Sequence, residues 1–108
     1  MNTQELEQAA EQLKKVLTPE QIAYGQAVTV CSVVLHLGLQ RASIEDVVDG
    51  LEERFDGMFE RDYIQDVAEG AISFGLQSGL MEMVDSETFS LSSTGVMVGK
   101  NWLAQQAA

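Results

Sequence analysis

The sequence predicts a mainly α-helical fold that carries one small β-hairpin, and three observations lead to this fold class. Apolar residues recur at helical spacing through four segments before residue 79. After that point, two short and partly alternating stretches, LMEMV and TFSLS, flank Asp85-Ser86-Glu87, a gap that suits a hairpin. The 108 residues contain no internal repeat and no Pro/Gly/Ser-rich linker, so we expect one domain over residues 1–108.

The first two helices are expected over residues 3–17 and about 20–38. The first has apolar side chains on one face and Gln and Glu on the other. Thr18 is placed to cap the second helix, and Pro19 suits a first helical position. The second segment is apolar over most of its circumference, which predicts the central helix of a small fold. Gly38 is expected to end it.

Two more helices are predicted before the hairpin. Ser43 is placed to cap the first of them, and Asp46 lies three residues on, where an acid completes a capping box. Asp56-Gly57 predicts a turn. Asp62 is then expected to cap the next helix.

Gly79 is expected to end that fourth helix, and the hairpin follows it. Ser92 or Ser93 is placed to cap a last helix over residues 94–106. Trp102 lies in this last segment, which therefore also needs an apolar partner.

The order of these elements from residue 20 onward resembles the winged-helix fold, over about 75 residues. The most specific stretch is Gly79-Leu80 … Phe89-Ser90-Leu91-Ser92-Ser93-Thr94-Gly95. It is similar to the Gly-Leu strand, wing and Leu-Ser/Thr-x-x-Gly turn of winged-helix transcription regulators. The resemblance implies a winged-helix-like core of three helices plus wing over 20–93, flanked by an N-terminal helix (3–17) and a C-terminal helix (94–106). Such flanking helices often make a dimer, which implies homodimer contacts at Leu6, Leu13, Trp102 and Leu103.

Charge argues against the DNA binding that the resemblance suggests. The window Ser43 to Glu69 holds ten acids against Arg54 and Arg61, so 27 residues carry −8 of the net −11. The expected wing adds only acids and a serine. DNA-binding proteins typically make about 6–10 phosphate contacts through Lys and Arg. We therefore expect direct nucleic acid binding through this face to be absent.

The acidic helices favour a basic protein partner instead. Within the third expected helix, carboxylates recur at offsets 0, 4, 7 and 11, which sets one about every 5–6 Å along one side. A surface that only kept the protein soluble would mix both signs of charge. Met58 and Phe59, beside Gly57, are candidate apolar anchors. The expected partner-binding residues are Glu45, Asp49, Glu52, Glu53, Asp56, Met58, Phe59, Asp62, Asp66 and Glu69. A DNA mimic, which inhibits a nucleic-acid-binding protein, is one concrete version.

Two alternatives stay open at this point. A dimeric winged-helix regulator of transcription would need its basic residues gathered on one face, and these are Lys14, Lys15, Arg41, Arg54, Arg61 and Lys100. A structural subunit of a larger assembly would bury the terminal helices and leave the acidic face in solvent.

Enzymatic activity, cofactors and metals are not expected. The sequence has no nucleophile motif and no phosphate-binding Gly-rich loop. His36 and Cys31 are five residues apart, which does not make one ligand face on a helix, and we expect Cys31 to be buried. The single cysteine and the absence of a leader or an 18-residue apolar run favour a cytoplasmic protein with no membrane contact.

Overall fold

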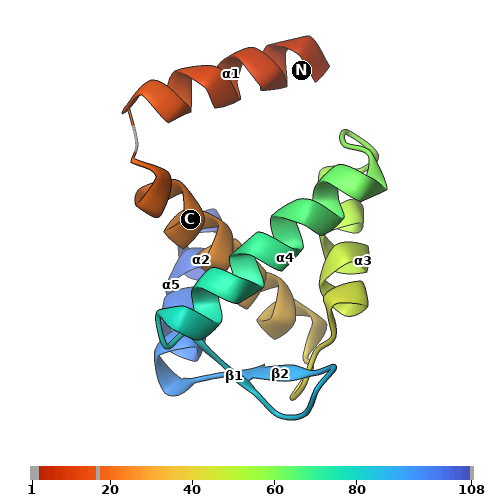
Figure 1. Ribbon diagram of the computed structural model, residues 1–108, viewed down its shortest axis with the longest axis vertical. Helices are drawn as coiled ribbons and strands as arrows, with labels where there is room; N and C mark the ends of the chain where they lie inside the picture. Colours follow the sequence, from red (N-terminus) through yellow and green to blue (C-terminus); the bar gives the residue numbers. More distant parts are fainter. Residues whose placement is uncertain (1–2, 17, 108) are drawn as a thin grey trace.

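The computed structural model describes residues 3–16 and 18–107 (Figure 1). The described chain forms a mainly helical fold with one two-stranded antiparallel hairpin, which confirms the predicted fold class. In order, the elements are α1 (Thr3–Val16), α2 (Pro19–Leu37), α3 (Ile44–Phe55), α4 (Arg61–Gln77), β1 (Met81–Met83), β2 (Phe89–Leu91) and α5 (Ser93–Ala107).

The caps predicted at Thr18 and Ser43 are present, and at both helix starts the structure has a full capping box, which the sequence predicted only for Ser43 and Asp46. Gln21 N donates to Thr18 Oγ1 at 3.1 Å, and Thr18 N donates to Gln21 Oε1 at 2.9 Å. Ser43 and Asp46 exchange the same pair of hydrogen bonds. Each box satisfies two backbone N–H groups at its helix start. At the other end of α2, Gly38 adopts φ +71°, the left-handed conformation that ends a helix.

The start of α4 differs from the prediction. Asp62 was expected to cap this helix, but it lies in the first turn, and Glu60 occupies the cap position without a side-chain cap. The earlier start places Arg61 at the first helical position, where its side chain reaches acids of α3. The observed start of α4 therefore coincides with a contact between α4 and α3. The helix ends at Gln77, and Gly79, with φ +81°, lies just beyond the end.

The start of α5 is capped by the first of the two candidate serines. Gly95 N donates to Ser92 Oγ at 3.1 Å, and that hydroxyl donates to the carbonyl of Gly79. One side chain thus caps α5 and ties it to the chain segment before β1.

The core forms around α2, which packs against α3, α4 and α5. Its residues Ala27, Val30, Cys31 and Val34 are buried, as the nearly all-apolar sequence of this helix predicts. In the hairpin, Met81 pairs with Leu91 and Met83 pairs with Phe89.

An isolated bridge between Ala42 and Phe89 adds the segment before α3 to the open edge of β2. Ala42 N donates to Phe89 O at 2.8 Å, and Phe89 N donates to Ala42 O at 2.9 Å. Three helices, this bridge and a hairpin are an arrangement compatible with a winged-helix-like fold.

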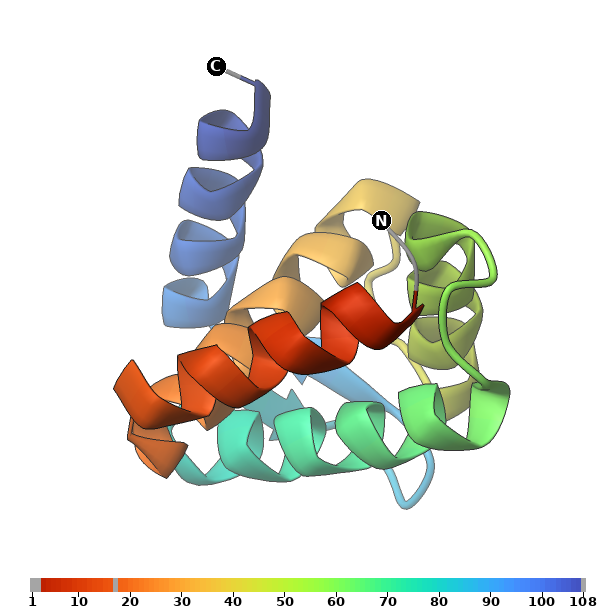
Figure 2. The same ribbon diagram turned by 90° about the horizontal axis from the view of Figure 1, so that it is seen from above.

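The helices α2 and α4 cross. Two perpendicular views show α1 on the side of this crossing where α2 and α4 begin (Figures 1 and 2). The last turns of α5 extend away from α3 and α4 in Figure 2. No helix among the described residues is long and apolar enough to cross a bilayer.

Candidate functional site

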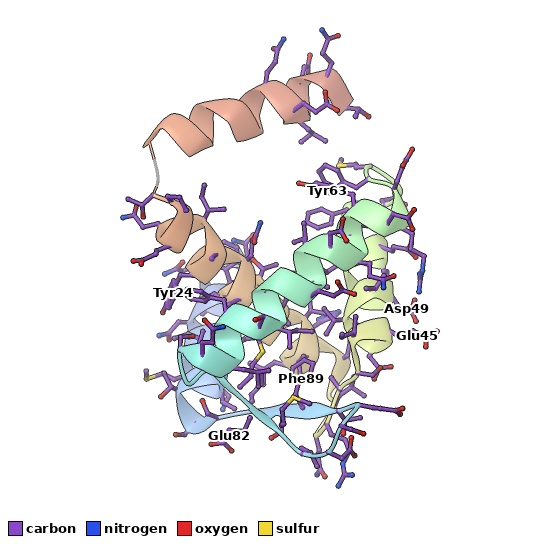
Figure 3. The ribbon with its side chains drawn as sticks, in the orientation of Figure 1. Tyr24, Glu45, Asp49, Tyr63, Glu82 and Phe89 are labelled. Carbon is purple, nitrogen blue, oxygen red and sulfur yellow. The ribbon has the colours of Figure 1, made fainter. Side chains whose placement is uncertain are left out.

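The acidic side chains predicted to bind a partner lie on the outer surfaces of α3 and α4. On α3, Glu45 and Asp49 point away from the core (Figure 3), and Glu53 and Asp56 are also exposed. On α4, Asp62, Asp66 and Glu69 are exposed at offsets of four and three residues, which is one side of a helix. The sequence predicted a row of acids on α3, and the structure shows a second row on α4; the exposed acids of both rows are accessible to a partner.

Arg61 joins the two acidic rows. Its Nη1 lies 3.0 Å from Asp49 Oδ1 and 2.8 Å from Glu52 Oε2. The hydrogen bond to Asp49, supported by the charge of Glu52, raises the pKa of Arg61. One cation from α4 thus offsets two carboxylates of α3. The middle of the α3 row carries less net charge than the sequence alone indicates.

The second arginine of this region, Arg54, is exposed but bonds to a buried hydroxyl. Arg54 Nη1 donates to Ser32 Oγ at 3.1 Å, and Ser32 lies fully buried in α2. The same hydroxyl donates to Thr29 O at 2.6 Å. Arg54 therefore completes the hydrogen bonding of a buried polar group. Among the described residues from 43 to 69, both cations are thus engaged within the chain.

The two candidate apolar anchors have different surroundings. Met58 is 43% exposed in the loop before α4. Phe59 is half-buried, with its ring centroid 5.3 Å from that of Phe55 and 5.2 Å from that of Tyr63. Only Met58 therefore projects from the surface, while Phe59 is the middle member of a series of three rings.

These three rings line a cavity of about 210 Å³ between α2, α3 and α4, which was not predicted from the sequence. Tyr63 is more than half exposed and lies near the N-terminal end of α4, on the side that α1 passes (Figure 3). The remaining lining residues are Gln26, Thr29, Val30, Leu51, Ile64 and Val67. A signal was present in the sequence, because Phe55, Phe59 and Tyr63 recur every four residues.

The wing surface is also acidic. Glu82, Asp85, Ser86 and Glu87 are all exposed. Asp85 Oδ1 accepts hydrogen bonds from the backbone N–H groups of Glu87 and Thr88, both at 2.8 Å. These hydrogen bonds lower the pKa of Asp85. The side chain of Asp85 therefore shapes the turn of the hairpin.

The residues predicted to form a dimer are placed only in part. Leu6, Trp102 and Leu103 are half-buried, and the side chain of Leu13 lies outside the described ones. Trp102 borders a second hollow with Tyr24 and Val28, between α2 and α5. Its indole Nε1 is shielded from solvent and has no hydrogen-bond acceptor in the described part of the chain.

In the described ranges, no three His, Cys, Asp or Glu side chains gather in a way that would hold a metal ion. Cys31 is buried, as predicted, and burial raises its pKa to about 11. His36 is exposed in the last turn of α2.

Comparisons of the chain with protein-family models, with curated proteins and with solved structures gave no match.

Proposed function

We propose that this protein is a non-enzymatic, winged-helix-like regulator or adaptor that binds a basic protein surface through α3 and α4. The observation that carries the proposal is the set of exposed carboxylates on these two helices, where both nearby arginines are engaged within the chain. Such a surface steers a basic partner toward it and sets the register of docking. An inhibitor that occupies a nucleic-acid-binding groove is the most concrete form of this function.

The acids best suited to a test are those without a structural role. Asp49 and Glu52 already pair with Arg61, and Asp56 adopts φ +48° at the end of α3, so their replacement would change more than the charge offered to a partner. Glu53 and Asp66 are exposed and make no hydrogen bond or ion pair with the described residues. Reversal of these two charges therefore tests the surface with little effect on folding.

The experiment measures the binding of a fluorescent lysine-rich peptide by anisotropy. Glu53→Lys/Asp66→Lys changes the net charge from −11 to −7, because each reversal adds two charges. Glu7→Lys/Glu20→Lys, on α1 and the start of α2, makes the same change elsewhere. We expect the first variant to lose most of the peptide affinity and the second to keep it. Equal losses would show that only net charge matters and would refute a binding face.

A dimeric DNA-binding regulator is the main alternative. It requires free basic residues on one face, whereas Arg54 donates to Ser32 and Arg61 pairs with Asp49 and Glu52. The side chains of Lys14 and Lys15 lie outside the described ones. Among the described side chains, Arg41 on the loop before α3 and Lys100 on α5 remain for phosphate contacts.

A structural subunit of a larger assembly is the second alternative. The observation that favours it is apolar surface on the C-terminal helix α5, where Met97 is 56% exposed. In that case the charge reversals at Glu53 and Asp66 would leave assembly unchanged.

A further inference from the structure

We propose that the cavity between α2, α3 and α4 receives one large apolar side chain from a basic segment of the partner. The inference rests on the proposed function and names the chemistry of the ligand: an aromatic or bulky aliphatic residue flanked by Lys or Arg. It assigns the apolar part of the contact to a built cavity and the charged part to the acids around it.

The walls of the cavity suit an apolar group. The rings of Phe55, Phe59 and Tyr63 form one side, and Leu51 and Val67 add aliphatic surface. Phe55 and Phe59 meet edge to face and Phe59 and Tyr63 meet at a tilt, so the three rings hold one another in place. All of these walls except Phe59 belong to three packed helices, and Phe59 is held between two rings. The cavity therefore exists before a ligand arrives, which lowers the entropic cost of binding.

Its size favours a side chain over a free small molecule. Cavities that enclose drug-sized ligands measure about 300–1,000 Å³. The cavity here measures about 210 Å³, and the more than half-exposed Tyr63 is part of its lining. A single anchor residue that enters such a pocket is the usual centre of a protein–protein contact.

Charge decides what surrounds that anchor residue. Asp66 lies three residues after Tyr63 and so shares its side of α4, and Glu60 and Asp62 precede Tyr63 in the chain. All three acids are exposed. An acidic or neutral segment would gain nothing from these carboxylates, whereas Lys or Arg beside the anchor would pair with them.

The α2 wall supplies one polar group for orientation. Gln26 lines the cavity, is half-buried, and makes no hydrogen bond to the described residues. Its amide is able both to donate to and to accept from the backbone of an incoming segment. Thr29, its neighbour in the wall, already donates its hydroxyl hydrogen to Gly25 O at 2.9 Å.

The test uses two lysine-rich peptides of equal length and charge that differ at one central position, Phe or Ala. We expect the full chain to bind the Phe peptide at least about 10-fold more tightly, because the ring leaves water on binding. Equal affinity for the two peptides would overturn the cavity proposal while the charge-based function stands. Failure of both peptides to bind would overturn the proposed function as well.

Variants locate the effect within the molecule. Val67→Phe fills the cavity from α4 and Gln26→Phe fills it from α2, and we expect each to remove the preference for the Phe peptide. Val84→Phe makes the same Val-to-Phe change on the exposed wing, outside the cavity, and should leave the preference for the Phe peptide in place. A preference that survives both cavity variants, in chains with native circular dichroism, would refute the site.

The two tyrosines give a direct readout by NMR. The ring signals of Tyr63 should shift on addition of the Phe peptide, while those of Tyr24, which packs against Phe74 outside this cavity, should not. Shifts at Tyr24 alone would place the contact on the face of α2 and α5 and overturn the proposal.

Discussion

Arg61 Nη1 lies 3.0 Å from Asp49 Oδ1, and this contact ties the first residue of α4 to the middle of α3. Both side chains are largely exposed, so water and salt screen the attraction between them. The pair therefore matters more for the charge of the surface than for the stability of the fold.

Replacement of Arg61 by Gln should accordingly strengthen the binding of basic peptides. The change frees Asp49 and Glu52 for the ligand and removes one of the two cations of the acidic region. We expect tighter binding of the lysine-rich peptide at about 50 mM salt, with a melting temperature lowered by a few degrees at most. Arg41→Gln has the same change in net charge, and an equal gain in that variant would contradict the local explanation.

A close approach of α5 to α2 depends on Gly99. A Cβ at this position would lie 2.7 Å from Leu35 Cδ1 and 3.2 Å from the carbonyl carbon of Cys31. Gly99→Ala should therefore lower the free energy of unfolding, by about 1–3 kcal/mol, because one neighbour is backbone. Gly70→Ala, in α4, meets nothing within 4 Å and should raise it by about 0.5–1 kcal/mol.

Urea denaturation of the two glycine variants measures both effects against one wild type. Opposite signs would confirm that packing at the crossing of α2 and α5, and not helix propensity, decides the outcome. A stabilised Gly99→Ala variant would mean that the two helices are able to separate without cost.

The buried thiol of Cys31 should react only when the protein unfolds. Burial raises its pKa from 9.0 to about 11, so at pH 8 the reactive thiolate is roughly 100-fold scarcer than in an exposed cysteine. We expect almost no reaction with a disulfide reagent such as DTNB at pH 8 in buffer, and prompt reaction in urea. Fast labelling of the native protein would show that α2 and α5 open frequently around this residue.

The same pKa shift predicts how stability depends on pH. The folded pKa is raised, so the contribution of Cys31 is fully present below pH 9 and is lost as the pH rises toward about 11. Stability should therefore fall over this range in the wild type and fall less in Cys31→Ala. Equal slopes in the two proteins, measured by urea denaturation, would assign the alkaline loss to other groups.

The turn of the hairpin depends on Asp85, which accepts hydrogen bonds from the N–H groups of Glu87 and Thr88. Asp85→Ala should increase the hydrogen-exchange rates of those two amides, and Asp85→Asn should restore part of the protection through its side-chain oxygen. The pKa of Asp85 is lowered in the folded protein. Its contribution to the stability of the fold is therefore present above the usual carboxyl pKa, and it is lost as the pH falls through the lower pKa of the folded state. Unchanged exchange in Asp85→Ala would show that the strands alone hold the turn.

Local features of this fold were predictable, and contacts between distant segments were not. Thr18, Ser43 and Gly38 act within one helical turn, so their roles follow from their neighbours in the sequence. The start of α4 could not be found in this way, because it coincides with the reach of Arg61 to α3.

The candidate site was likewise predictable only in its local features. Exposure of the acids on α3 and α4 followed from helical spacing. The cavity did not, because its walls come from three helices and its ring series continues through the loop between α3 and α4. The hydrogen bond from Arg54 on α3 to Ser32 on α2 joins residues 22 positions apart, so local patterns could not predict it either.

The last prediction separates the proposed function from that of a DNA-binding regulator. The outer face of α4 and the wing expose acids, and the arginines of α3 and α4 are engaged within the chain. We therefore expect that the protein does not change the anisotropy of a labelled generic DNA duplex at about 50 mM salt. A lysine-rich peptide, which binds the duplex itself, serves as the positive control. Binding at about 50 mM that collapses at about 200 mM would show phosphate contacts. In that case the basic residues must be gathered by dimer symmetry, and the acidic surface would no longer be the leading candidate site.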